Sequence, residues 1–174
     1  MQARKADTTP PVNQAAFEEM NSEIRKLKEK EPALLKKHLE VFNDAVIAII
    51  ITVMVLEVPL PNENIASYYT FLQSVLVFLI SFFIVANFWY DLHQIYSLLK
   101  KATRKILIIN FIFLFTLSLI PLLTKWIMQN PSSLAVINYG VAYFIINFVR
   151  LVMYNYAFQD YFSQSNLFSV TPIA

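Results

Sequence analysis

Residues 38–57 read HLEVFNDAVIAIIITVMVLE, a short polar segment that runs directly into a long apolar one. The apolar part, from about Val41 to Val58, approaches the roughly 20 residues that a helix needs to cross the hydrocarbon core of a bilayer. Asp44 stands at its start, and a carboxylate is costly to hold against lipid. We therefore predict a membrane-spanning helix with Asp44 at its mouth, facing protein or water.

The rest of the chain repeats this pattern. Hydrophobic residues make up 57% of the 174 positions, including 15 Phe and 9 Tyr, and the charged residues gather between the apolar runs. Three more runs are long enough to span a bilayer, at about 68–90, 106–128 and 134–158. The sequence predicts an all-α, polytopic membrane protein with a domain of four transmembrane helices over residues 41–158.

The segments outside this domain are polar. We expect disorder over residues 1–20 and a charged juxtamembrane helix over 21–40, which Pro32 ends or kinks. The run NSEIRKLKEKE at 21–31 is rich in helix formers and suits either a solvated helix or one that lies on the lipid surface. Residues 159–174 contain no further apolar span and are expected to form a C-terminal tail.

Lysine and arginine predict the orientation of the chain in the membrane. They are dense before the first span and in the loop between the second and third spans, whereas residues 59–67 and 129–133 contain none. Cytoplasmic loops of membrane proteins carry the excess of these residues. Both termini are therefore predicted to be cytoplasmic.

The composition argues against several function classes. The chain has no cysteine, which removes thiolate catalysis, and its single glycine, Gly140, leaves no glycine-rich phosphate loop. His38 and His93 stand on different segments without paired carboxylates, so we expect no metal site and no cofactor. No nucleophile–base pair is found and the net charge is only +2, so neither an enzyme nor a nucleic-acid-binding protein is indicated.

The first span allows more than one interpretation. Asn43 and Asp44 are good N-cap residues, so capping alone can explain the polar cluster. Ile49, Val53 and Leu56 are spaced i, i+4 and i+7 and share one helix face, which either packs against neighbouring helices or lines a pathway. Thr52 lies beside them, and its hydroxyl either serves that pathway or bonds a carbonyl of its own helix.

The same residues carry a family resemblance. The run HLEVFNDAVIAIIITVMVLEV, which starts at His38, closely resembles the first helix of the transmembrane-protein-175 family, the lysosomal and bacterial potassium channels. Members begin with Arg, three residues and Phe-Ser-Asp, followed by Ile, Thr and Leu at set offsets in an apolar helix. The matching positions are Phe42, Asp44, Ile49, Thr52 and Leu56. His38 stands where the motif has Arg, and Asn43 stands where it has Ser.

Later segments extend the resemblance. The run FWYDLH, with Trp89 and His93, looks like the end of the family's second helix. The run NFIFLFTLSLIP, which starts at Asn110, looks like its third helix, so the likeness covers about residues 35–125. Bacterial members have six spans, so a chain with four is expected to be either a short member or a fragment.

The resemblance implies a potassium-selective or cation-leak channel. The first helix of each subunit would line a central pore, with Ile49, Val53 and Leu56 as apolar rings at the constriction and Thr52 as their polar neighbour. The implied partners are potassium ions, the lipid bilayer and further copies of the chain in a homotetramer. The implied location is the bacterial plasma membrane.

The resemblance also implies a polar network that braces the first helix. Its expected members are His38, Phe42, Asn43, Asp44, Trp89, His93 and Asn110. With His38 in the place of Arg, this network would be positively charged only near or below neutral pH, so we expect pH to modulate stability or gating. Asp44 lies about 7.5 Å from Ile49 along the helix axis, where it would attract cations without coordinating one in the constriction.

Two other functions stay open. A small proton-coupled transporter usually needs an acid near the midplane, whereas Asp44 and Glu57 lie at the ends of the first span. A non-conducting scaffold, or a partner of a full-length channel, would not use the pore features. Arg150, inside the fourth span, is expected either to snorkel or to pair with an acid.

Overall fold

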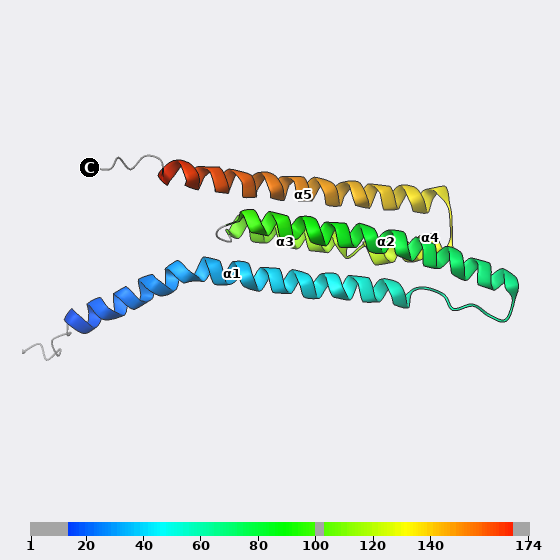
Figure 1. Cartoon of the computed structure of the whole chain (residues 1–174), viewed down its shortest axis with the longest axis horizontal. Helices are drawn as coiled ribbons and strands as arrows, with labels where there is room; N and C mark the ends of the chain where they lie inside the picture. The colour runs from blue at the N-terminus through cyan, green and yellow to red at the C-terminus, as the bar shows by residue number, and fades with distance from the viewer. Residues whose placement is uncertain (1–13, 100–102, 169–174) are drawn as a thin grey trace, which may run out of the picture.

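The structure is a computed structural model that describes residues 14–99 and 103–168, and these residues form helices and short connections without a strand. The helices are α1 (Gln14–Leu56), α2 (Ile65–Leu98), α3 (Arg104–Leu117), α4 (Ile120–Gln129) and α5 (Ser133–Phe168) (Figure 1). Four segments are long and apolar enough to cross a membrane, and α3 with α4 makes one of them, over Arg104–Gln129. The predicted all-α architecture with four transmembrane helices is confirmed.

The first helix is longer than predicted. It begins at Gln14, so residues 14–20, which were expected to be disordered, are helical. This stretch is rich in Gln, Ala, Glu and Met, and their helix propensity outweighs the polarity that suggested disorder. The rest of the expected disordered segment, residues 1–13, lies outside the described residues.

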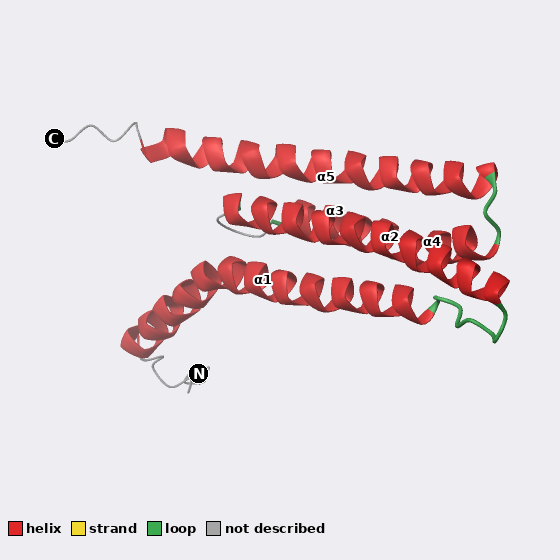
Figure 2. Cartoon of the chain, turned by 45° about the vertical axis from the view of Figure 1, so that its right-hand side comes forward, coloured by secondary structure: helices red, strands yellow, loops and turns green. Residues whose placement is uncertain are grey.

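Pro32 lies inside α1 and does not end it. The helix instead changes direction between its charged first half and its apolar second half, and the first half extends away from the other helices (Figure 2). Proline lacks an N–H and its ring crowds the carbonyl four residues earlier, at Lys28, which accounts for a bend. Of the two outcomes expected for Pro32, the kink is the one observed.

The fourth span is also longer than predicted, because α5 continues to Phe168. Part of the expected C-terminal tail is therefore helical, and residues 169–174 lie outside the described part of the chain. Aromatic side chains one turn apart support this extension: the ring centroids of Tyr154 and Phe158 are 6.2 Å apart, and those of Phe158 and Phe162 are 4.5 Å apart. Such i, i+4 pairs stabilise helices.

The third span is broken near its middle. Pro121 stands in the first turn of α4, where a missing N–H is tolerated. Before it, the Ser118 N–H donates to the Leu114 carbonyl oxygen at 2.9 Å and the Leu119 N–H donates to the Thr116 carbonyl oxygen at 3.2 Å, which closes α3 with a tightened turn. The helix restarts at Ile120 and continues in the same span.

A narrow core lies where the four spans meet. Its largest fully buried side chains come from every span and include Met54, Phe88, Phe113, Leu117, Ile120 and Ile146. The rings of Phe88 and Phe113 meet edge to face with centroids 6.1 Å apart, a favourable geometry for two aromatic side chains. The interior of the bundle is thus filled by side chains from all four spans.

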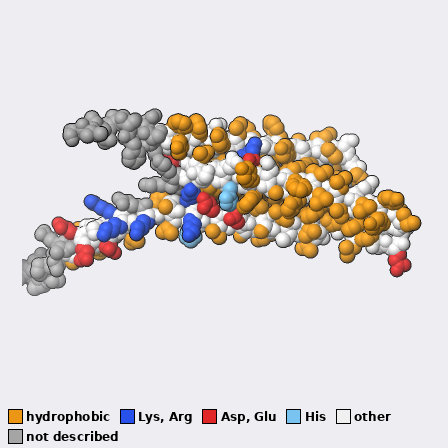
Figure 3. Space-filling model, viewed as in Figure 1, with side chains coloured by type: hydrophobic (Ala, Val, Ile, Leu, Met, Phe, Trp, Pro, Cys, Tyr) orange, Lys and Arg blue, Asp and Glu red, His pale blue; other side chains and the backbone are white. Residues whose placement is uncertain are grey.

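Much of the outer surface of the bundle is apolar. Figure 3 shows hydrophobic side chains over the spans, whereas lysine and arginine gather on the first half of α1. Many of these apolar side chains are at least half exposed, among them Phe83, Phe115, Phe144 and Phe148. An apolar surface of this extent is unfavourable in water and suits lipid. The protein is therefore an integral membrane protein.

Candidate functional site

The second half of α1 has a packed face and an exposed face, about 110° apart around the helix. One face is buried against the other spans, and its residues are spaced three or four apart: Leu39, Asn43, Ile47, Ile50 and Met54. The predicted stripe lies on another face: Ile49 is 60% exposed, Val53 39% and Leu56 82%. Since consecutive helical residues are rotated by about 100°, packing one face leaves the other for lipid or for a partner chain. The described part of this chain leaves the stripe largely exposed, and Ile49 and Val53 border a groove beside Pro121 and Leu122 of α4.

The Thr52 hydroxyl bonds within its own helix. Its Oγ1 donates to the Ile49 carbonyl oxygen at 2.8 Å, and the side chain is exposed beside the stripe. Of the two roles left open by the sequence, the structure shows the bond to a carbonyl of the same helix, here that of the residue three positions earlier. The hydroxyl oxygen keeps its lone pairs and can still accept a hydrogen bond or face a cation.

Asn43 is a buried packing residue of a continuous helix, and helix capping does not explain it. α1 runs through this position, and the Asn43 side chain is 1% exposed. Its Nδ2 donates to the Asn110 Oδ1 at 3.0 Å, and the Asn110 Nδ2 donates to the Asn43 Oδ1 at 2.9 Å. The Tyr96 hydroxyl oxygen accepts a further hydrogen bond from the Asn43 Nδ2 at 2.8 Å. This cluster joins α1, α2 and α3.

Asp44 belongs to a second contact at the same level. Its Oδ1 accepts a hydrogen bond from the Trp89 indole Nε1 at 2.8 Å, which links α1 to α2. The His93 ring lies against the Trp89 ring with centroids 4.8 Å apart. On the other side of α1, the Phe42 and Phe111 rings meet edge to face at 5.9 Å. The acid at the mouth of the span is therefore exposed and contacts protein through Trp89.

His38 lies outside these contacts. Its side chain is exposed, and no hydrogen bond or ion pair joins it to the described residues. The reason is helical phase: five residues separate His38 from Asn43, which turns the two side chains about 140° apart. The geometry therefore gives no support to a pH-sensitive brace that runs through His38.

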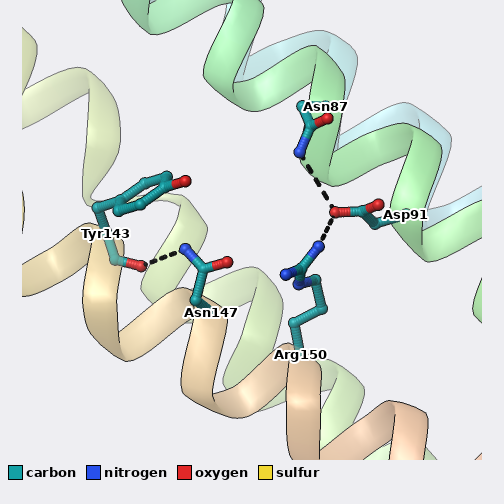
Figure 4. Close-up of polar contacts among 5 residues, drawn as sticks. All are labelled: Asn87, Asp91, Tyr143, Asn147 and Arg150. Carbon is teal, nitrogen blue, oxygen red and sulfur yellow. Dashed lines mark hydrogen bonds and ion pairs between the residues drawn. The ribbon is translucent and has the colours of Figure 1, made fainter.

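Arg150 pairs with an acid, one of its two predicted outcomes. The Arg150 guanidinium forms an ion pair with the Asp91 carboxylate between α5 and α2, and the Asn87 Nδ2 donates to the same carboxylate at 3.3 Å (Figure 4). The two charged side chains are only 35% and 21% exposed. Asn147, one turn away, donates instead to the Tyr143 carbonyl oxygen at 2.9 Å.

Sequence reasoning missed two partners in these contacts. Tyr96 resembles any aromatic residue of an apolar helix, and only the packing of α1 and α3 against α2 shows why its hydroxyl is buried. Asp91 could have been predicted from the sequence. Arg150 lies inside an apolar span and therefore needs an acidic partner, and Asp91 stands at the end of the second predicted span.

A third polar cluster ties α4 to α2 and α5. The Thr124 hydroxyl donates to the Ser81 hydroxyl oxygen at 2.9 Å, and the Tyr139 hydroxyl donates to the same oxygen at 3.2 Å. Ser81 and Thr124 are both buried. Every buried side-chain nitrogen and oxygen of the described residues has a hydrogen-bond partner, so the interior polar groups act as links between helices.

Comparison with known proteins identifies the family of this segment. Residues 38–121 match the model of the family described as endosomal/lysosomal potassium channel TMEM175. A potassium channel of Chryseobacterium sp. (strain P1-3) is 40% identical over 114 residues, which cover 62% of this chain and 57% of that protein. A potassium channel of Chamaesiphon minutus (strain ATCC 27169 / PCC 6605) is 28% identical over 122 residues, which cover 64% of this chain and 60% of that protein. The chain thus spans less than two thirds of the length of these relatives.

The fold agrees with this assignment. The crystal structure of a lysosomal potassium-selective channel TMEM175 homolog from Chamaesiphon minutus matches with a TM-score of 0.62 and 24% sequence identity, and 76% of each chain is covered. The family model covers the polar cluster, the exposed stripe and the first three spans. The resemblance predicted from the first-helix motif is confirmed over residues 38–121, which match the TMEM175 family model.

Proposed function

We propose that this chain is a subunit of a potassium-selective or cation-leak channel whose pore is lined by the second half of α1. The observation that carries the proposal is the exposure of Ile49, Val53 and Leu56 on a face that lies beside the packed one. The family of residues 38–121 and the relatives named as potassium channels support it.

The stripe has the chemistry of a hydrophobic constriction. Rings of branched aliphatic side chains gate by dewetting and force an ion to shed water. Potassium loses its water at lower cost than sodium, so such a ring favours potassium. Asp44 stands toward the cytoplasmic mouth that we propose, where its charge attracts cations, and its bond to Trp89 holds it in place.

A pore of this kind needs several copies of the chain. The interior of the described bundle is filled by packed side chains, so one copy offers no path along its own axis. A symmetric ring can place one α1 from each copy around an axis, and we propose a homotetramer. Conduction is a transport activity, and we propose no catalytic role.

We propose that both termini lie in the cytoplasm of a bacterium and that the chain resides in the plasma membrane. The distribution of lysine and arginine supports this orientation, because residues 59–67 contain none while the first half of α1 is rich in them. The bacterial sources of the two relatives support the location.

Potassium flux into proteoliposomes tests the pore. Ile49→Asn and Leu56→Asn place an amide in the constriction, so we expect at least about a threefold loss of potassium over sodium preference, because the dehydrating ring is interrupted. The matched control is Leu76→Asn on α2, since Leu76 is 59% exposed and Ile49 60%. Its selectivity should equal that of the wild type.

Two results would contradict the channel. Flux at the background level for the wild type and for every variant would indicate a scaffold that does not conduct. An equal loss of selectivity in Leu76→Asn would show that polar substitutions act through the bilayer rather than through a pore.

A small proton-coupled transporter is the second candidate, because the Asp91–Arg150 pair lies between two spans and is partly shielded from solvent. A transporter would accumulate its substrate against a gradient when an inward proton gradient is imposed, and Asp91→Asn would abolish that accumulation. Passive potassium flux that saturates only weakly, and that is unchanged in Asp91→Asn, would favour the channel.

A further inference from the structure

The first half of α1 carries an apolar seam with coiled-coil spacing. The residues of this seam are separated alternately by three and four positions. They are Phe17, Met20, Ile24, Leu27 and Leu34, with Glu31 at the position between the last two. This spacing places them at positions a and d of successive heptads, with Phe17 at an a position. Glu31 and His38 occupy the remaining a positions up to the membrane. Polar residues at single a positions weaken a coiled coil but define its register.

The seam has no partner within the described part of the chain. Phe17, Met20, Ile24, Leu27 and Leu34 are all exposed, and Leu27 is 66% exposed. An open apolar groove runs along the helix between Ile24 and His38. Figure 1 shows this half of α1 extending beyond the bundle, where no other helix runs beside it. Three heptads of exposed seam are enough to pair with a similar helix.

The charges beside the seam suit a second copy of the same helix. Glu23 lies at a g position and Lys28 at the e position of the following heptad. In a parallel coiled coil these positions face each other on neighbouring chains, so Glu23 of one copy meets Lys28 of the next. Five residues separate the two within one chain, which keeps them apart on a single helix.

The seam and the stripe that we propose to line the pore lie on one helix, with Pro32 and its bend between them. Copies arranged around a pore axis by their stripes would bring the first halves of α1 together on one side of the membrane. They would also run parallel, because symmetry about an axis normal to the membrane starts every α1 on the same side.

We infer that the first half of α1, from Phe17 to His38, forms a parallel coiled coil with the same segment of other copies. This assembly lies outside the membrane and holds the subunits together beside the bilayer. The inference deepens the proposed function in one respect, since it gives the ring of subunits a dedicated contact. Pro32 occupies an outward b position, so it bends the helix without entering the seam.

The lipid surface is a poorer partner for this face. A helix that lies in the interface buries a broad apolar face in the headgroup region. The seam here is narrow, with two positions in seven, and charged or polar side chains occupy most of the flanking e and g positions, among them Asn21, Glu23, Lys28 and Lys30.

Cysteine cross-linking in the full chain tests the seam directly, because the natural chain contains no cysteine. Leu27→Cys places a thiol at d, and Ser22→Cys places one at the outward f position as a matched control. In proteoliposomes under mild oxidation, we expect at least about fivefold more disulfide-linked dimer for Leu27→Cys than for Ser22→Cys. Equal yields at both positions, or none at Leu27, would overturn the coiled coil.

A charge exchange provides the second test. Glu23→Lys sets like charges against each other and should reduce the Leu27→Cys cross-link by about threefold, and Lys28→Glu added to it should restore the yield. Failure of the double variant to recover while the protein stays folded by circular dichroism would contradict the g–e pairing. Protection of Leu27→Cys from a maleimide by lipid vesicles without any cross-link would assign this face to the membrane.

The outcome separates this inference from the proposed function. Cross-linking at Leu27 without potassium flux keeps the coiled coil and rejects the channel. Selective flux that responds to Ile49→Asn without cross-linking at Leu27 keeps the channel and rejects the coiled coil.

Discussion

The reciprocal pair of Asn43 and Asn110 illustrates how a polar residue becomes a structural contact in this protein. Each amide donates to the other, and the Tyr96 hydroxyl oxygen accepts a further hydrogen bond from Asn43. Asn43 is 1% and Asn110 0% exposed. A buried polar group is costly once its partner is lost, so each residue depends on the other.

We predict that Asn43→Leu lowers the free energy of unfolding by about 1–3 kcal/mol, because it leaves the Asn110 amide and the Tyr96 hydroxyl buried without a partner. The double variant Asn43→Leu/Asn110→Leu should lose less than the sum of the two single variants, since it removes both amides. Reversible unfolding in detergent measures these values. Strict additivity of the two substitutions would contradict the pairing.

Two partly shielded ion pairs join the spans, and the Asp91 carboxylate is the least exposed of their four charged groups. Asp91 and Arg150 connect α2 with α5, and their side chains are 21% and 35% exposed. Glu57 and Lys125 connect the end of α1 with α4 at 2.7 Å, and their side chains are 31% and 38% exposed. Exposed ion pairs contribute about 0–1 kcal/mol, whereas breaking a shielded pair leaves a poorly solvated charge.

Arg150→Met is therefore predicted to destabilise the protein by about 1–3 kcal/mol, and Lys125→Met, the matched control, by less than about 1 kcal/mol. Asp91→Leu combined with Arg150→Met should recover part of the loss, because it removes the unpaired acid. Thermal unfolding of the four proteins in one detergent provides the comparison. A larger loss for Lys125→Met would show that the pair at the end of α1 is the stronger link.

Over the whole molecule, α1 passes through three surroundings. Its first half carries a narrow seam and many charges, its middle anchors the bundle at Asn43, and its end exposes the stripe at Ile49 and Leu56. The second and third spans pack against this helix, and hydrophobic side chains cover much of the outer surface of the bundle (Figure 3). Because an α-helix has 3.6 residues per turn, its sequence can place packing residues on one face and exposed apolar residues on another.

The orientation of the molecule can be tested with the same cysteine-free background. Asn62→Cys, in the α1–α2 connection, should react with a membrane-impermeant maleimide added to intact cells, because the region without lysine or arginine is predicted to face outward. Ser22→Cys should react only after the cells are opened. Labelling of Ser22→Cys in intact cells would reverse the orientation.

Much of the fold could be predicted from the sequence, because a bilayer restricts spanning segments to long apolar helices whose backbone bonds are satisfied internally. The hydrophobic runs therefore indicated four spans, and the first-helix motif indicated the family of residues 38–121. The boundaries were less predictable. α1 starts at Gln14 and α5 ends at Phe168, since helix propensity and aromatic pairs extend them beyond the apolar windows.

Within the site, helical spacing placed Ile49, Val53 and Leu56 on one face, because a regular helix fixes which side chains share a side. Which face is packed was settled by contacts between helices that are distant in the sequence. Asn43 faces Asn110 and Tyr96, Arg150 faces Asp91, and His38 turns away from both clusters. The order of the residues sets the faces of each helix, whereas the packing of one helix on another decides which polar groups meet.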